Sequence, residues 1–146
     1  MMKRWFELHH RVTFEETNLV GNVYFTNYFL WQGQCREMFL HQHAPQALRE
    51  LQSGELRLVT AHASCDYLDE FVAFDAVCIR MSLNRFIPFG VSLNFEYGLQ
   101  TGDGPDQGFE LAARGRQDIK FMQRQGSAWA LFEVPNYLMQ ALIPYE

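Results

Sequence analysis

The segment from Val23 to about Gln42 constrains the fold of this chain more than any other part of the sequence. Its aromatic and apolar side chains recur at steps of three and four, which is the period of an α-helix. One stripe on this helix consists of Tyr24, Tyr28, Trp31, Cys35 and Met38, and the stripe beside it of Phe25, Phe29, Gln32, Arg36 and Phe39. Because the helix is apolar over so much of its circumference, we expect it to be buried on several sides. Its first residue stays open, since three residues are suitable caps: Asn22, Thr26 and Asn27.

The rest of the chain has mostly strand-like patterns. Residues 6–14 place apolar side chains at alternate positions, and a loop with Asn, Gly and two acidic residues follows at 15–22. Pro45 is expected to end the long helix, and a shorter helical piece is expected to run to Gln52. Further strands are predicted at 56–68, 74–86, 90–99, 109–123 and 127–134, with turns at 100–108 and 125–126. This order predicts a single α+β domain over residues 1–146, with an antiparallel sheet wrapped around one long central helix. The apolar segment 135–146 is expected to pack against the sheet or a neighbouring subunit.

Composition limits the class of protein. A formal net charge of −5 argues against a general nucleic-acid binder, which usually carries a basic face. The three cysteines are odd in number and widely spaced, so a disulfide framework is not expected and a reducing cytoplasm is favoured. No apolar run approaches the roughly 20 residues that span a bilayer. We therefore expect a cytoplasmic protein with neither membrane nor nucleic acid as a partner.

The loop and the helix start carry a recognisable motif, FEETNLVGNVYFTNYFLW, from Phe14 to Trp31. It resembles the signature of hotdog-fold thioesterases of the 4-hydroxybenzoyl-CoA type. That signature reads acid-x-Asp-x-x-Gly-x-Val-aromatic-aromatic-x-Asn-Tyr, followed by Trp. The resemblance implies a hotdog domain that hydrolyses thioesters at the start of its central helix, with no cofactor.

Residues 15–24 and 31–37 are more closely similar to the thioesterases of enediyne polyketide biosynthesis. Those enzymes hydrolyse a β-ketoacyl thioester of an iterative polyketide synthase, and decarboxylation then gives a methyl-ketone polyene. The implied partner is the acyl carrier protein of the synthase, which holds the polyene through its phosphopantetheine arm. The resemblance also implies a homo-oligomer with sites at subunit interfaces, either a dimer or a dimer of dimers (a homotetramer).

Asn18 stands where many hotdog thioesterases carry a catalytic Asp. An amide serves neither as a nucleophile nor as a general base near neutral pH. The chemistry must then rest on positioning and electrostatics, a property that the enediyne subfamily shares. By the same resemblance, the backbone N–H of Phe25 points at the thioester carbonyl, and Asn18 orients the attacking water or holds that carbonyl.

Arg36 is the next catalytic candidate, because a guanidinium on a mostly apolar helix is costly to bury unless it pairs with an anion. Either it stabilises negative charge at the substrate, or it forms a salt bridge to Glu15, Glu16 or the Glu37 of a neighbouring subunit. Tyr28 and Thr60 complete the catalytic candidates, although Tyr28 also fits the core stripe and strand threonines are usually structural. The residues expected to contact the substrate are Tyr24, Phe29 and Gln32.

Several alternatives stay open. Glu37 is the only carboxylate on the long helix, and a rival mechanism makes it the base or nucleophile of a general acyl- or aroyl-CoA thioesterase. A third hypothesis is a non-catalytic acyl-binding protein of the same fold. Arg114, Arg116 and Lys120 alternate on one strand face, where they either meet the acidic carrier protein and its phosphate or are simply solvated. The histidines have no spacing that suits a metal, so none is expected.

Overall fold

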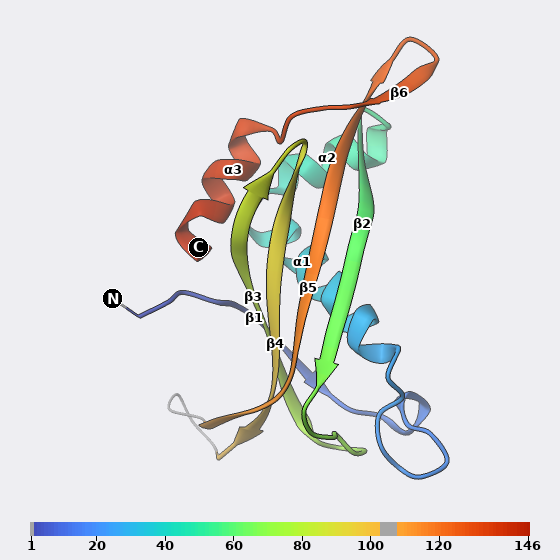
Figure 1. Ribbon diagram of the computed structural model, residues 1–146, viewed down its shortest axis with the longest axis vertical. Coiled ribbons are helices and arrows are strands. Elements are labelled where there is room, and N and C mark those ends of the chain that lie inside the picture. The colour runs from blue at the N-terminus through green and yellow to red at the C-terminus, as the bar shows by residue number, and fades with distance from the viewer. Residues whose placement is uncertain (1, 103–107) are drawn as a thin grey trace.

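One antiparallel sheet organises the protein, and the computed structural model describes residues 2–102 and 108–146. The strands lie in the order β1-β3-β4-β5-β2, and β6 pairs with the end of β5 (Figure 1). The strands are β1 (Phe6–Arg11), β2 (Leu56–Tyr67), β3 (Ala76–Ile87), β4 (Gly90–Thr101), β5 (Gly108–Gln125) and β6 (Ala128–Leu131). The helices are η1 (Phe14–Glu16), α1 (Asn27–His43), α2 (Pro45–Ser53), α3 (Asn136–Leu142) and η2 (Ile143–Tyr145).

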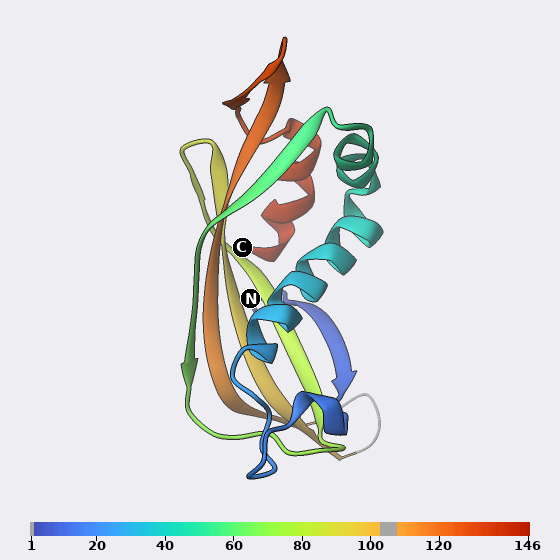
Figure 2. The same ribbon diagram turned by 90° about the vertical axis from the view of Figure 1, so that its right-hand side faces the viewer.

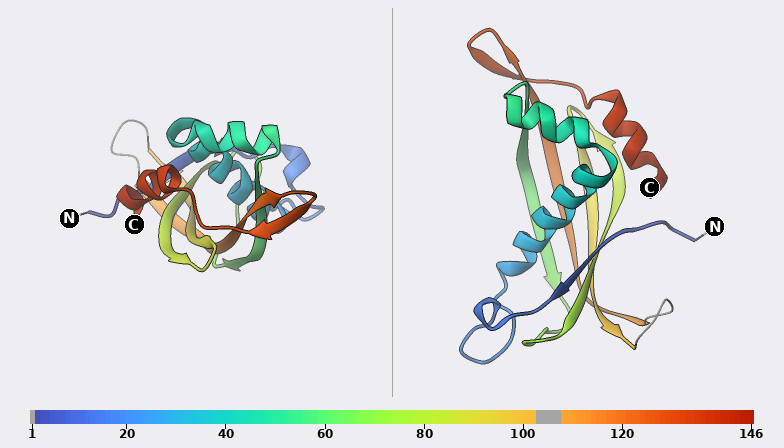
Figure 3. Two further views of the ribbon diagram at one scale, coloured as in Figure 1. Left: turned by 90° about the horizontal axis from the view of Figure 1, so that it is seen from above. Right: turned by 180° about the vertical axis from the view of Figure 1, so that it is seen from behind.

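The sheet curves, and the three α-helices of the described residues lie on its concave side (Figure 2). Viewed from above, the strands curl around the helical layer (Figure 3). The predicted α+β arrangement, in which an antiparallel sheet wraps around one long helix, is confirmed. The expected turn at 100–108 falls partly outside the described residues, which exclude 103–107.

Helix α1 begins at Asn27, and Thr26, one of the three caps that the sequence left open, caps it without a side-chain hydrogen bond. The Asn27 side chain donates to the backbone carbonyl of Glu16 at 2.9 Å, so this residue binds the preceding loop. The helix ends at His43, and Pro45 opens α2 as its first residue. Residues 25–26 form a turn before the helix, with Thr26 already in a helical conformation, and within the described residues the N–H groups of Phe25 and Thr26 have no protein acceptor.

The buried face of α1 differs in part from the predicted stripe. Tyr28, Trp31 and Cys35 are buried as expected, but Phe39 and not Met38 continues the buried face. Met38 is 37% exposed and Leu30 is 55% exposed. The single chain thus covers α1 on one side only, so the expectation of burial on several sides is not met within one subunit.

Strand β2 forms the edge of the sheet beside β5 and is exposed over most of its length. Its register against β5 shifts between Thr60 and His62, which makes Ala61 a bulge. The opposite edge is β1, which is half as long as β2. The long free edge of the molecule therefore lies on β2, beside the uncovered face of α1.

The C-terminal segment packs against its own chain, one of the two partners predicted for it. Leu138, Leu142 and Tyr145 are buried, and the Tyr145 ring meets those of Phe6 and Phe39 edge to face. Strand β6 is shorter than the predicted 127–134, because the chain leaves the sheet after Leu131 to reach α3. No helix among the described residues is long and apolar enough to cross a membrane.

Candidate active site

A cavity of about 240 Å³ lies at the start of α1. It combines the loop before the helix, the first helical turn and the segment after β2. Its lining residues are Asn18, Asn22, Val23, Tyr24, Phe25, Tyr28, Tyr67, Asp69 and Glu70. Four residues that the sequence assigned to a site therefore surround one cavity: Asn18, Tyr24, Phe25 and Tyr28.

Two backbone N–H groups at the helix start are available to a ligand. Among the described residues, the N–H groups of Phe25 and Thr26 donate to no protein acceptor. The Tyr67 hydroxyl donates to the Phe25 carbonyl at 2.9 Å and so fixes the peptide beyond it. Unpaired N–H groups at a helix start attract negative charge. The Phe25 N–H thus suits its expected role, and the Thr26 N–H is a second donor that the sequence did not single out.

Asn18 lies on the small loop that forms one wall of this cavity. Its backbone N–H donates to the Asn22 carbonyl at 2.9 Å, and its carbonyl accepts from Gly21 at 3.0 Å. Gly21 has φ +93°, a backbone conformation that favours glycine. The Asn18 side-chain oxygen accepts the Val20 N–H at 3.0 Å, while its Nδ2 donates to no acceptor in the described part of the chain. The amide group therefore retains a donor for a water or a carbonyl.

Glu16 connects this loop to the helix and to β1. Glu16 as a residue is 8% exposed, and its carboxylate accepts hydrogen bonds from His10 Nε2 at 2.8 Å and from the Thr13 N–H at 2.9 Å. It also accepts one from Trp31 Nε1 at 2.9 Å. Burial raises the pKa of Glu16, but these hydrogen bonds outweigh burial and hold the pKa below its ordinary value. Glu16 is thus a buried, ionised carboxylate. The sequence analysis named it only as one possible salt-bridge partner of Arg36.

Because its pKa is lowered in the folded state, Glu16 should stabilise the fold above the ordinary glutamate pKa of 4.5 and lose this effect as pH falls. We expect Glu16→Gln to lower the free energy of unfolding by roughly 1–3 kcal/mol near pH 7, since a donor faces the new amide. The difference from wild type should shrink on acidification below pH 4.5. Urea unfolding across this pH range measures it, with the exposed Glu15→Gln as a control that shows no such trend. A constant difference at all pH values would contradict the prediction.

Arg36 lies outside this cavity, in a polar network between α1 and β5. Its Nη1 donates to Gln117 Oε1 at 2.8 Å, and Gln117 Nε2 donates to Gln32 Oε1 at 3.5 Å. Gln32 is fully buried and donates in turn to the Ser64 carbonyl at 3.0 Å. A side chain at Gly115 has no room here, because its Cβ would lie 2.4 Å from Gln32 Nε2. Gln32, expected to contact substrate, is thus a structural partner of Gln117.

The Arg36 charge has no carboxylate partner within the described residues. None of the ion pairs includes it, so the salt bridge to Glu15 or Glu16 that the sequence left open does not form. Burial lowers the pKa of Arg36, an effect that the charge of Glu37 partly offsets. Its Nε is buried without an acceptor. The guanidinium therefore retains hydrogen-bonding capacity for an anion.

We expect Gln117→Leu to destabilise the protein by about 1–3 kcal/mol, because it leaves the Arg36 Nη1 and the Gln32 amide without their partner. Urea unfolding at fixed protein concentration measures this loss. Gln125→Leu, at the exposed end of β5, is the matched control and should change stability by less than about 0.5 kcal/mol. Equal stabilities of the two variants would show that the network contributes nothing.

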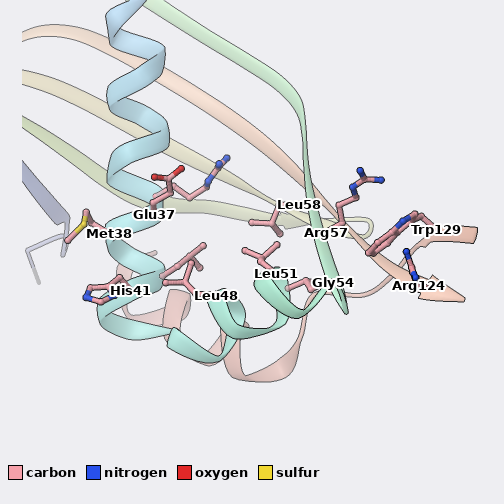
Figure 4. Close-up of a pocket in the computed structure, with 13 residues that line it drawn as sticks. Glu37, Met38, His41, Leu48, Leu51, Gly54, Arg57, Leu58, Arg124 and Trp129 are labelled. Carbon is pink, nitrogen blue, oxygen red and sulfur yellow. The ribbon is translucent and has the colours of Figure 1, made fainter.

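Two further cavities meet at Arg36. A narrow one runs under α1 and is lined, apart from Arg36, by apolar side chains: Phe39, Leu40, Leu58, Met81, Val91, Leu93, Ile119, Phe121, Leu138 and Leu142. An open groove of about 760 Å³ leads outward between α1, α2, β2 and the β5–β6 hairpin (Figure 4). At its mouth, Arg57 and Arg124 both stack on Trp129. The inner cavity has only about 20 Å³ of space, roughly that of one water molecule, whereas the outer groove is large enough for a long acyl chain.

The remaining candidates lie elsewhere. Phe29 is half-buried on α1, and Thr60 is exposed on β2 opposite Ile119. Arg114, Arg116 and Lys120 lie on one face of β5, opposite the face that carries Gln117. Arg116 pairs with Asp118 at 3.2 Å, Arg114 lies 4.0 Å from Glu96, and Lys120 donates to the Pro88 carbonyl at 2.6 Å. Tyr28 is buried among aromatic rings, in agreement with the core alternative.

Cross-strand pairing creates a cluster that spacing along the sequence did not indicate. Glu7, His9 and Cys78 place possible metal-ligand atoms within 4.8 Å of one another on β1 and β3. The Cys78 thiol donates to Glu7 at 3.0 Å, and Arg80 Nε lies 3.5 Å from the same carboxylate. Cys78 and Arg80 are thus already partners of the Glu7 carboxylate.

Glu37 is exposed on α1 and forms no ion pair among the described residues.

The fold and this helix start are those of a thioesterase-like protein, and residues 12–142 match the family model of the thioesterase-like superfamily. The chain belongs to that superfamily and is a thioester hydrolase of the hotdog fold. Among solved structures, it is 42% identical to the dynemicin thioesterase, with a TM-score of 0.87 over 97% of both chains. No curated protein sequence matches it.

More distant structures share the fold at low identity. A 1,4-dihydroxy-2-naphthoyl-CoA thioesterase from Synechocystis is 16% identical, with a TM-score of 0.80 over 96% of each chain. A mutant 4-hydroxybenzoyl-CoA thioesterase, in complex with 4-hydroxybenzoyl-CoA, is 16% identical, with a TM-score of 0.79. That match covers 95% of this chain and 99% of the other.

Proposed function

We propose that this protein hydrolyses a long, polyunsaturated β-ketoacyl thioester held on the acyl carrier protein of an iterative enediyne polyketide synthase. Decarboxylation of the released β-keto acid then gives a methyl-ketone polyene. The observation that carries the proposal is the pairing of a site that has Asn18 in place of a catalytic Asp with an open groove of about 760 Å³, which Arg36 lines together with apolar side chains of α1, α2 and β2. The 42% identity to the dynemicin thioesterase, whose crystal structures reveal effects of polyene binding, supports the same substrate class.

The reaction needs a water, a polarised carbonyl and stabilisation of an oxyanion. In our proposal, the Phe25 N–H donates to the thioester oxygen, helped by the positive end of α1. The Asn18 amide holds the attacking water or the carbonyl. Water adds to the carbonyl carbon, the C–S bond breaks, and the thiol leaves with a proton. A β-keto acid loses carbon dioxide readily, so no group beyond those of the site is required for the last step.

Arg36 serves the same site through a second subunit in this proposal. It lies nine positions after Asn27, about 14 Å further along α1 at 1.5 Å per residue. The exposed side chains of α1 and the free edge of β2 leave surface for a second subunit, and we propose that pairing through β2 brings the helix start of one chain to the Arg36 of the other. In this proposal, the expected dimer forms a complete site from the helix start of one subunit and the Arg36 of the other.

The carrier protein remains the proposed source of the substrate. Arg114, Arg116 and Lys120 are engaged within the chain, which leaves less of their charge for an acidic partner. We retain them as the carrier-binding face, with weak and salt-dependent association as the expected behaviour. The alternative function, a general acyl- or aroyl-CoA thioesterase with Glu37 as the base, predicts a different substrate range.

A paired thiol-release assay separates these functions. Wild type and Glu37→Gln are each given a long β-ketoacyl thioester and the saturated acyl thioester of equal length, and products are identified by mass spectrometry. We expect methyl ketone from the β-keto substrate, little turnover of the saturated one, and no loss in Glu37→Gln. Equal turnover of both substrates together with an inactive Glu37→Gln would establish the general thioesterase instead. Binding of a thioester analogue without thiol release would contradict hydrolysis of either substrate.

A further inference from the structure

Asn18 and the Phe25 N–H, the two groups proposed to act on the thioester, lie at the start and the end of one short loop. The residue Glu16 binds both ends of this loop. Asn18 comes two positions after Glu16, and Phe25 comes directly after Tyr24. The Glu16 carbonyl accepts the Tyr24 N–H at 2.8 Å and the Asn27 side chain at 2.9 Å. The backbone of Glu16 therefore sets the start of the loop against its end and against the first residue of α1.

The side chain of Glu16 connects the same loop to the rest of the fold. One carboxylate oxygen, Oε2, accepts from Trp31 Nε1 on α1 at 2.9 Å, and the other, Oε1, accepts from the Thr13 N–H. His10 on β1 reaches both oxygens, at 2.8 and 2.9 Å, and its ring packs on that of Trp31. Donors thus converge on both oxygens of one buried carboxylate.

From this geometry we propose that Glu16 is a positioning residue for thioester hydrolysis, which fixes Asn18 and the Phe25 N–H relative to each other. Glu16 lines neither the cavity at the helix start nor the groove at Arg36. It acts by holding the loop between β1 and α1 in one conformation. This inference rests on the proposed function for its kinetic consequence, but the positioning itself is a property of the folded loop.

Only a carboxylate meets these donors. An amide of the same shape has one oxygen and one NH₂, so it accepts on one side and opposes a donor on the other. Glu16→Gln therefore keeps the size of the side chain but loses the hydrogen bonds that one of the two carboxylate oxygens accepts. A displacement of about 1 Å at a reacting group is sufficient to lower a rate roughly a hundredfold.

The experiment compares Glu16→Gln with Glu15→Gln, which removes the same charge from the adjacent, exposed position. We expect kcat for the β-ketoacyl thioester to fall about 10- to 100-fold in Glu16→Gln, with KM within about twofold, because the groove at Arg36 is unchanged. Glu15→Gln should match wild type. The backbone amide signals of Asn18 and Phe25 in ¹H–¹⁵N spectra should move in Glu16→Gln alone.

Trp31→Phe provides a second variant, because it removes one donor and keeps an aromatic ring in the core. It should shift the same amide signals, with a smaller loss of kcat, even if Glu16→Gln folds poorly. A folded Glu16→Gln with the kcat and amide signals of Glu15→Gln would overturn the proposal. If wild type releases no thiol, the proposed function fails, while unchanged Asn18 and Phe25 signals in both variants would independently overturn the positioning role.

Discussion

Arg36→Ala is expected to release thiol from a long β-ketoacyl thioester about 10²- to 10³-fold more slowly than wild type, through kcat. The guanidinium has no carboxylate partner among the described residues and retains a buried Nε without an acceptor. Such a group stabilises charge that develops in the reaction without first breaking an ion pair. Single-turnover thiol release at saturating substrate measures the effect.

Arg57→Ala is the matched control, because Arg57 lies on the same groove but stacks on Trp129 at its exposed mouth. It should leave kcat within about twofold. Arg36→Lys keeps the charge and loses the planar fork, so its rate should lie between those of wild type and Arg36→Ala. If Arg36→Ala and Arg57→Ala hydrolyse equally fast, Arg36 is no part of the reaction.

Phe39→Ala is expected to lower the free energy of unfolding by about 3–5 kcal/mol, the usual cost of removing a buried aromatic ring. Phe39 is 1% exposed and lies within 5.2–5.5 Å, centroid to centroid, of the rings of Phe6, His43 and Tyr145. The loss should also loosen η2, whose Tyr145 packs on Phe39, and α3, whose Leu138 and Leu142 line the small apolar cavity. Urea unfolding at a fixed protein concentration measures it.

Met38→Ala is the control for this change, one residue earlier on the same helix. Met38 is partly exposed, so its removal should cost less than about 1 kcal/mol. A reversed order of the two variants would mean that Met38, and not Phe39, is buried in the assembled protein. That result would place a neighbouring subunit over the outer face of α1.

Local patterns in the sequence predicted the elements of the fold well. Trp31 and Cys35 recur at helical spacing, Pro45 marks the break after α1, and the motif around Asn18 identified the family. The choice between Met38 and Phe39 as core could not be made, since both are apolar and contacts with distant rings, those of Phe6 and Tyr145, favour Phe39. Periodicity gives a helix face to within one residue, and tertiary contacts decide the rest.

The site was predictable only where its residues are close in sequence. Asn18 and Phe25 meet at one cavity because a single loop carries both. The partners of Glu16, in contrast, lie 6 and 15 positions away on different elements. Gln117 sits in a strand of alternating polar residues, and nothing in that pattern distinguishes it from its neighbours. Contacts between distant strands and helices carry no signal in one sequence.

The free edge of β2 also bears on how the protein assembles in the cell. It presents a long row of unpaired backbone groups with no proline to block it. An isolated subunit is therefore open to strand addition by any extended chain, including another unfolded copy. In the proposed dimer, pairing of two native subunits would be bimolecular, so its rate would rise with the square of the subunit concentration. Slow synthesis should prolong the vulnerable stage, and the bulge at Ala61 and the exposed charges of Arg57 and Asp66 are features of this edge that disfavour wrong pairing.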